Sequence, residues 1–199
     1  MKAVMPVMPP DILAYRQRHG MDRYDEMWQG VLHMAPAPNF AHQDLEGETA
    51  SWLRRHWGRP RHAKVIQQIN VASVGGWPDD FRIPDICLLT PERFHINRNE
   101  YLEGAPNLLI EIHCPGDETY EKLTWYAALG VPEVWVIHRD TTEPEIHLLR
   151  RGRYRKQRVL ASGWLRSLGT GIELRRTPDD KLGIRLINDD VSRDDLPVD

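Results

Sequence analysis

The stretch LLIEIHCPGDETYEKLTWYAALGVPEVWVIH, residues 108–138, contains the pattern that decides the fold. Residues 108–114 form an apolar run that predicts a strand. Asp117 is a good helix N-cap and Gly130 is a stop signal, so a helix is expected between them. Residues 133–138 predict a buried strand. This part of the chain is therefore expected to form strand, helix and strand in succession.

Working outward from this unit, the residues upstream predict both helices and strands, and those downstream predict a hairpin. Helices are expected at residues 11–19, 24–28 and 40–57, the last capped by Asn39. Strands are expected at residues 31–34, 64–74 and 82–89, and a hairpin at 145–150 and 154–160. This order predicts an α/β fold of the α+β kind, in which helices flank a mixed β-sheet.

The composition is typical of one soluble domain, with 41% hydrophobic and 28% charged residues in a chain of 199. We expect this domain to span residues 1–176. Residues 177–199 hold seven Asp against three basic residues, a net charge of −4, and predict a weakly ordered acidic tail. No apolar run approaches the roughly 18 residues of a membrane span, and no convincing signal peptide is present. Cys87 and Cys114 form no disulfide framework, so a reducing, cytoplasmic setting is expected.

The distribution of charge matters more than the net charge of −3, which by itself argues against a nucleic-acid partner. Residues 1–176 hold 22 acidic and 23 basic side chains, a net charge of +1. Two clusters within them are locally basic, namely Arg54, Arg55, Arg59, Arg61 and Lys64, and Arg150, Arg151, Arg153, Arg155, Lys156 and Arg158. Each cluster is either a solvated face or a surface that contacts phosphates.

Two of the predicted strands each carry a carboxylate inside an apolar run. Asp85 lies within residues 83–89, and Glu111 lies within residues 108–114 on the same strand face as His113. An unpaired buried carboxylate is costly, so each acid is expected to be paired, protonated or bound to a cation. The alternative is that Asp85 only opens its strand and that Glu111 pairs with an arginine.

Lys122 lies in the helix after Glu111, with Glu118 and Tyr126 one turn away on either side. It is either a solvent-exposed residue paired with a glutamate or a residue that reaches the sheet face carrying Glu111. The sequence leaves both interpretations open.

A zinc site is a weaker alternative. Its candidate ligands are Cys87, His113, Cys114 and His138. Adjacent strand residues point to opposite faces, however, so His113 and Cys114 do not readily share one ion.

Taken in order, these residues resemble one protein family. The matching strings are RYDEMWQGV (23–31), MAPAP (34–38), His42, PDI (84–86), LIEI (109–112), CPGD (114–117), Lys122, Tyr126 and GVPEVW (130–135). They are similar to the motifs of the Uma-two family, bacterial restriction-endonuclease-like proteins of the PD-(D/E)XK nuclease superfamily. The resemblance covers about residues 10–160.

The resemblance implies a restriction-endonuclease-like core of helix, three strands, helix and strand. It implies that Asp85 and Glu111 bind Mg²⁺, which Mn²⁺ can replace, with Glu26 from an N-terminal helix as a further ligand. In the superfamily a lysine stands two residues after the second acid, where this chain has His113. In the Uma-two family the lysine comes from the next helix, at the position of Lys122.

The implied function is hydrolysis of DNA phosphodiesters by a metal-dependent endonuclease. The catalytic candidates are Asp85, Glu111, Lys122, Glu26 and His113, and the substrate-binding candidates are His42, Tyr126, Arg54 and Arg55. A homodimer is expected, because duplex cleavage cuts two strands and the chain has one apparent site. One rival is a catalytically inactive nuclease-fold protein that binds DNA or a protein partner. Another is a metal-dependent hydrolase of a different phosphoester.

Overall fold

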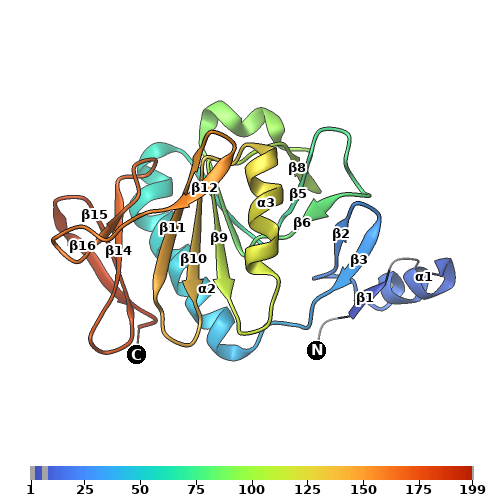
Figure 1. Cartoon of the computed structure of the whole chain (residues 1–199), viewed down its shortest axis with the longest axis horizontal. Coiled ribbons are helices and arrows are strands. Elements are labelled where there is room, and N and C mark those ends of the chain that lie inside the picture. Colours follow the sequence, from blue (N-terminus) through green and yellow to red (C-terminus); the bar gives the residue numbers. More distant parts are fainter. Residues whose placement is uncertain (1–2, 6–8, 199) are drawn as a thin grey trace.

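The computed structural model describes residues 3–5 and 9–198, and a mixed β-sheet lies at its centre (Figure 1). The strand order of this sheet is β12-β11-β10-β9-β7-β4. The strands are β4 (Lys64–Gln67), β7 (Ile86–Leu89), β9 (Leu108–His113), β10 (Glu133–His138), β11 (Pro144–Arg150) and β12 (Arg153–Lys156). β9 and β10 are parallel and are joined by helix α3 (Thr119–Leu129), whereas the other neighbouring pairs are antiparallel. The predicted mixed sheet, its strand-helix-strand unit and the hairpin near residue 151 are confirmed.

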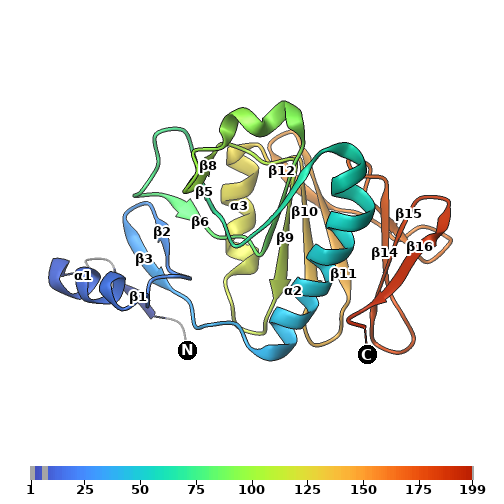
Figure 2. The same ribbon diagram turned by 180° about the vertical axis from the view of Figure 1, so that it is seen from behind.

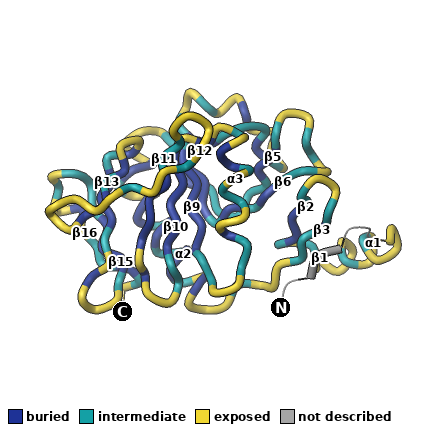
Figure 3. The backbone as a smooth tube through the Cα atoms, viewed as in Figure 1, coloured by how far each residue is buried: buried dark blue, intermediate teal, exposed yellow. Residues whose placement is uncertain are grey.

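Helix α2 (Phe40–Leu53) covers one face of the central sheet and α3 covers the other (Figures 1 and 2). The side chains of β9 alternate between these faces. Ile110 belongs to the same core cluster as Trp52 of α2, whereas Leu109 belongs to the cluster that contains Tyr126 of α3. Each fully buried Leu or Ile contributes roughly 1.5–3 kcal/mol relative to an exposed one. Burial on both faces, visible as the dark strands of Figure 3, therefore fixes which residues face each helix.

Local signals set the ends of α2. The side-chain oxygen of Asn39 accepts a hydrogen bond from the backbone N–H of His42 at 3.0 Å, which satisfies one of the free donors of the first turn. The helix continues as a π-helical segment (Arg54–Gly58) and a 3-10 turn (Arg59–Arg61). The helix predicted at residues 40–57 is therefore confirmed.

Helix α3 begins one residue later than predicted, because Glu118 and not Asp117 is its N-cap residue. The Asp117 carboxylate accepts a hydrogen bond from the backbone N–H of Thr119 at 2.9 Å, just where the helix begins. Gly130 ends the helix with a φ of 88°, a left-handed conformation that glycine adopts without the steric cost of a side chain. Both predicted limits of this helix hold to within two residues.

A second sheet, made largely of N-terminal strands, has the order β1-β3-β2-β6-β5-β8. Its strands are β1 (Ala3–Met5), β2 (Glu26–Trp28), β3 (Val31–Met34), β5 (Asn70–Ala72), β6 (Phe81–Arg82) and β8 (Tyr101–Glu103). The helix α1 (Pro10–Arg18) and a 3-10 helix (Pro91–Ile96) accompany it. The helix expected at residues 11–19 and the strand expected at 31–34 are confirmed.

The short helix predicted at residues 24–28 is wrong, because its second half forms strand β2. β2 pairs with β3 across a turn in which Gln29 and Gly30 have φ angles of 52° and 82°. Positive φ at both central residues gives the twist that a two-residue hairpin needs. β2 also pairs with β6, through Met27 and Phe81. The local hairpin with β3 and the long-range pairing with β6 together outweigh the helical tendency of these residues.

Two predicted strands are each divided between the sheets. The strand expected at residues 64–74 forms β4 in the central sheet and β5 in the second sheet, with Gln68 at a φ of 52° between them. The strand expected at residues 82–89 forms β6 and β7, which residues 83–85 separate. Between residues 64 and 89 the chain thus crosses from one sheet to the other twice, and Asp85 lies at one of these two crossings.

The weakly ordered tail predicted at residues 177–199 is also wrong for the described residues 177–198. They contribute β15 (Leu182–Leu186) and β16 (Asp189–Leu196) to an antiparallel sheet with β13 (Leu165–Arg166) and β14 (Ile172–Arg176). Ile184 and Leu196 join the core cluster of α2, and the indole N–H of Trp52 donates to the Ser192 carbonyl at 2.8 Å. The aspartates lie between the few apolar residues that face the core, so the acidic composition gave no indication of this sheet. Among the described residues, no helix is long and apolar enough to cross a membrane.

Candidate active site

A pocket of about 430 Å³ opens where the two sheets meet. Its walls come from the β2–β3 hairpin, residues 35–39, the start of α2, the carboxyl end of β9 and the first turns of α3. Five of the predicted site residues line it, namely Glu26, His42, Asp85, Glu111 and Lys122. Residues far apart in the sequence therefore converge here because the chain crosses between the sheets.

Asp85 stands immediately before β7 and is held from two directions. One carboxylate oxygen, Oδ2, accepts the backbone N–H of Ile112 at 2.6 Å. The other, Oδ1, lies 3.0 Å from Nε2 of His42. The carboxylate is thereby fixed beside β9, with 16% of its side chain exposed.

Glu111 is buried on β9, 3% exposed, beneath the pocket. The Tyr126 hydroxyl donates to its Oε1 at 2.5 Å, and Nζ of Lys122 lies 3.3 Å from its Oε2. Burial raises the pKa of Glu111 to about 8; Lys122 opposes this rise, while the charges of Asp85 and Glu26 add to it. The carboxyl group therefore lies where a cation would stabilise its charged form.

Lys122 projects from α3 into the pocket floor. Its Nζ forms an ion pair with Glu26 Oε1 at 2.8 Å in addition to its contact with Glu111. Burial by itself would lower the pKa of Lys122, but the charges of Glu111 and Glu26 outweigh burial and raise that pKa. Of the two interpretations left open by the sequence, the structure has the one in which Lys122 reaches the sheet face that carries Glu111.

Glu26 lies on strand β2, and not on a helix as the resemblance implied. Its Oε1 also accepts the backbone N–H of Ile83 at 2.8 Å, and its Oε2 accepts the indole N–H of Trp28 at 2.7 Å. The second sheet thus brings an acid close to β9 of the first, where Lys122 bridges it to Glu111.

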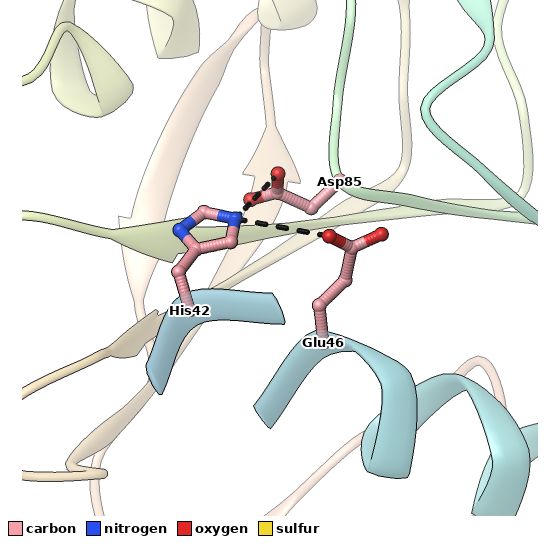
Figure 4. A group of neighbouring side chains, drawn as sticks. All are labelled: His42, Glu46 and Asp85. Carbon is pink, nitrogen blue, oxygen red and sulfur yellow. Dashed lines mark hydrogen bonds and ion pairs between the residues drawn. The ribbon is translucent and has the colours of Figure 1, made fainter. Parts of the chain in front are cut away.

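His42 lies on the other side of Asp85, one helical turn from Glu46 (Figure 4). Its Nε2 lies 3.0 Å from Asp85 Oδ1 and 3.8 Å from Glu46 Oε2. Burial would lower the pKa of His42, but hydrogen bonds to Asp85 and to the sulfur of Cys114 raise it to about 10. Sequence reasoning missed Glu46, although its spacing of four residues from His42 on a predicted helix placed both on one face.

The remaining candidates do not line the pocket among the described residues. His113 hydrogen-bonds Asp117 at 2.9 Å and packs its ring against Tyr120 and His138. Tyr126 is fully buried beneath Glu111, so it supports that acid and does not face the pocket. Arg54 and Arg55 lie in the π-helical segment that follows α2. There the Arg54 guanidinium donates hydrogen bonds to the Val65 carbonyl and to the side-chain oxygen of Gln67.

Arg139, at the turn after β10, lines the pocket and was also missed. Its Nε donates to Asp140 at 2.7 Å. No sequence motif marks it, because it reaches the pocket only through the turn between β10 and β11. Among the described residues, it is the one arginine that lines the pocket.

The donor set fits a divalent cation bound by oxygen atoms. Asp85, Glu111 and Glu26 bring three carboxylates to one pocket, and Lys122 is the ammonium among them. Hard oxygen ligands of this kind suit Mg²⁺, which keeps several waters and needs few protein ligands. Among the described residues, the one group of three His, Cys, Asp or Glu ligand atoms within 4.8 Å of one another is His42, Glu46 and Asp85. Neither the residues of the zinc alternative nor Asp85, Glu111 and Glu26 together form so close a group.

The chain matches a family model described as "Uma2: Putative restriction endonuclease" over residues 10–178. It is also similar to a crystal structure described as "a putative nuclease belonging to DUF820 from Anabaena variabilis ATCC 29413", at 18% identity and a TM-score of 0.54. That similarity covers 66% of this chain and 75% of the other, and it shows a shared fold. No curated protein matches the chain. Since the family model spans most of the sequence, the chain belongs to the Uma2 family, the family that its motifs resemble.

Proposed function

We propose that the protein is a Mg²⁺-dependent DNA endonuclease, in which Mn²⁺ can substitute for Mg²⁺. The observation that carries the proposal is the position of Lys122, buried between Glu111 and Glu26 and close to Asp85. Carboxylates that can hold a divalent cation, with an ammonium beside them, are groups that metal-dependent phosphodiester hydrolysis uses. Membership of a family described as "Putative restriction endonuclease" supports the same reaction.

Asp85 and Glu111 would hold the ion, with Glu26 as a further acid on the opposite wall. Mg²⁺ bound there would polarise the phosphodiester and lower the pKa of a bound water. The protein's own task is to hold these carboxylates in place. The Ile112 N–H orients Asp85, and the Tyr126 hydroxyl orients Glu111.

Lys122 acts on the attacking water or on the charge that develops on the phosphate. Its ammonium stays charged because the acids raise its pKa, so it donates hydrogen bonds and does not act as a base. Arg139, which lines the pocket, contacts an incoming phosphate. In this role, the hydrogen bonds from Lys122 strengthen as negative charge builds up on the phosphate in the transition state. They therefore lower the activation barrier of cleavage, so that Lys122 affects kcat and not only KM.

The proposed partner is DNA, and the proposed assembly is a homodimer whose two pockets cut the two strands of a duplex. We place this activity in the reducing cytoplasm, where Cys87 and Cys114 remain free thiols. Sedimentation of the protein at micromolar concentration tests the assembly. A monomer that still makes double-strand breaks contradicts it.

The second candidate is an inactive nuclease-fold protein that binds DNA or a protein partner. His113, at the position of the superfamily lysine, favours it, because its ring lies away from the pocket and supplies no ammonium there. The two candidates differ in one measurement. Nicking of supercoiled plasmid over a titration of Mg²⁺ gives product for the endonuclease and none for the inactive protein, with Asp85→Asn as the matched negative control. Hydrolysis of a small phosphodiester without plasmid nicking would instead identify a hydrolase of another substrate.

A further inference from the structure

The β11–β12 hairpin carries exposed arginines that the proposed cleavage does not use, namely Arg150, Arg151, Arg153 and Arg155. Within the described part of the chain, no hydrogen bond or ion pair engages the side chain of any of them. Other basic side chains do have carboxylate partners. Lys156 of the same hairpin pairs with Glu145 at 2.6 Å, and Arg98 pairs with Glu103 at 3.0 Å. The hairpin therefore carries positive charges that no acid of the described chain compensates.

The strand register gathers three of these charges on one face of the hairpin. Arg150 and Arg153 are direct cross-strand partners, and Arg155 follows Arg153 by two residues, so it points to the same side. Tyr154 points to the other side, where its hydroxyl donates to the Val131 carbonyl at 2.8 Å and its ring packs against the core cluster of α3. Like charges directly opposite each other destabilise a strand pair. An anion bound between the arginines would remove this repulsion.

The turn of the hairpin holds a further arginine at a position whose backbone favours other residues. Arg151 and Gly152 have φ angles of 51° and 77°. Two-residue turns of this kind favour Asn or Asp before the glycine, because short polar side chains tolerate the left-handed conformation best. Arg151 lacks that local advantage, and its guanidinium adds a positive charge at the tip of the hairpin.

The hairpin tip lies at the opposite end of the central sheet from the pocket. The pocket opens at the carboxyl end of β9, whereas β11 runs antiparallel to β10 and ends with Arg150 beside the amino end of β10. β9 and β10 each have six residues, which span roughly 20 Å at about 3.3 Å per residue. Figure 1 shows the tip near the end of α3, away from the first turns of α3 that line the pocket. A ligand of these arginines therefore does not have to enter the pocket.

We propose that Arg150, Arg151, Arg153 and Arg155 form a nucleic-acid-binding surface outside the pocket, which holds the phosphodiester backbone without reading its sequence. A guanidinium binds two phosphate oxygens through parallel N–H···O bonds. Protein partners usually need an apolar or aromatic centre of contact, and residues 150–158 hold no exposed large apolar side chain. This composition favours a nucleic acid over an acidic protein surface. The surface goes beyond the proposed function, because binding there needs neither a metal nor cleavage.

Fluorescence anisotropy with a short labelled DNA duplex tests the surface on the full-length protein, in EDTA so that no cleavage occurs. The glutamine variant combines Arg150→Gln, Arg153→Gln and Arg155→Gln. It should bind at least about 10-fold more weakly at low salt, and the slope of log affinity against log salt should fall by about 2–3, since each lost phosphate contact removes about 0.9. The lysine variant, with Arg150→Lys, Arg153→Lys and Arg155→Lys, keeps the charges and should keep the wild-type slope.

The matched control removes the same charge from exposed arginines elsewhere, by Arg18→Gln, Arg176→Gln and Arg193→Gln, and should bind within a few-fold of wild type. An equal loss of affinity in this control overturns the inference, as does a lysine variant whose slope falls like that of the glutamine variant. β12 is also an edge strand, which charged side chains protect from pairing with other chains. Aggregation of the glutamine variant with unchanged DNA affinity would assign the arginines to that role and overturn the inference. A wild-type protein that does not bind the duplex overturns it as well. Hairpin-dependent binding by a protein that never nicks plasmid in Mg²⁺ leaves the surface standing and overturns the endonuclease.

Discussion

At the scale of single residues, Lys122 decides how the pocket balances its charge. Its Nζ lies 2.8 Å from Glu26 and 3.3 Å from Glu111, and both acids are almost fully buried. Removing one partner of a buried ion pair leaves an uncompensated charge and typically costs about 3–5 kcal/mol. The same ammonium is therefore needed for the fold of the pocket and is placed where it can act on a phosphate.

Lys122→Ala should lower the single-turnover rate of DNA cleavage by roughly 10²–10³-fold, the usual loss when one donor to the developing charge is removed. Mn²⁺ should still bind through Asp85 and Glu111. His113→Ala is the matched comparison and should keep its rate within a few-fold, because His113 faces Tyr120 and His138. Loss of cleavage in His113→Ala with survival of Lys122→Ala would assign the lysine's role to His113.

Asp85→Asn and Glu111→Gln should each abolish metal-dependent cleavage while the protein remains folded. Each change removes one charge but keeps the shape of the side chain, so the Ile112 N–H and the Tyr126 hydroxyl retain an oxygen acceptor. The measurement is plasmid nicking, with far-ultraviolet circular dichroism as the check on folding. Full activity in either variant would remove that residue from the site.

At the scale of elements, the pocket depends on how the β2–β3 hairpin is fixed against α3. The guanidinium of Arg82 lies between the rings of Trp28 and Trp125, 4.3 and 4.6 Å from their centroids. His33 of β3 hydrogen-bonds Glu118 at the start of α3, at 3.0 Å. These contacts keep Glu26 of the hairpin within reach of Lys122, although the two belong to different sheets.

A second group of contacts joins β10, β11 and β12. Glu145 accepts hydrogen bonds from Lys156 at 2.6 Å and His147 at 2.8 Å, and lies 3.3 Å from His138. Burial would raise the pKa of Glu145, but these partners outweigh it and lower the pKa to about 2. A carboxyl whose pKa is lower in the folded state stabilises the fold above its unfolded pKa, and this stabilisation is lost as the pH falls through the folded pKa.

Glu145→Gln should therefore reduce the free energy of unfolding by about 1 kcal/mol at neutral pH, the scale of partly exposed ion pairs. The difference from wild type should shrink as the pH falls from about 4.5 towards 2. Urea unfolding across this range measures it, with Glu143→Gln, at an exposed position just before β11, as the control. A difference that does not change with pH would show that the ion pairs contribute nothing.

At the scale of the whole molecule, the C-terminal sheet completes the core on the α2 side. Ile184 is fully buried there, whereas Val191 on the neighbouring strand is 96% exposed. The fold thus extends to the described end of the chain, and α2, which carries His42 and Glu46, is packed on both the central and the C-terminal sheet.

Ile184→Ala should lower the free energy of unfolding by about 2–5 kcal/mol, the usual cost of emptying a buried aliphatic site. Val191→Ala should change it by no more than about 0.5 kcal/mol, because the side chain is already in water. Urea or thermal unfolding measures both. Two equally small effects would restore the weakly ordered tail that the composition suggested.

The sequence by itself determined the features that depend on neighbouring residues. Asn39 and Gly130 act within one helical turn, so the ends of α2 and α3 follow from local hydrogen bonds and φ preferences. Alternation along 108–114 likewise indicated which side of β9 carries Glu111. The family motifs added the order of the acids and the lysine, and the family membership that they implied is confirmed.

Only the tertiary structure decided where distant segments meet. Glu26 lies on a strand because β2 pairs with β3 in a hairpin and with β6, more than fifty residues away in the sequence, and these pairings outweigh the local tendency to form a helix. Glu46 lies beside Asp85 because α2 packs on the central sheet where the chain crosses into β7. The aspartate-rich C-terminus is ordered because its few apolar residues are buried against Trp52 and its neighbours. Burial and long-range strand pairing depend on the whole chain, so no local pattern could reveal them.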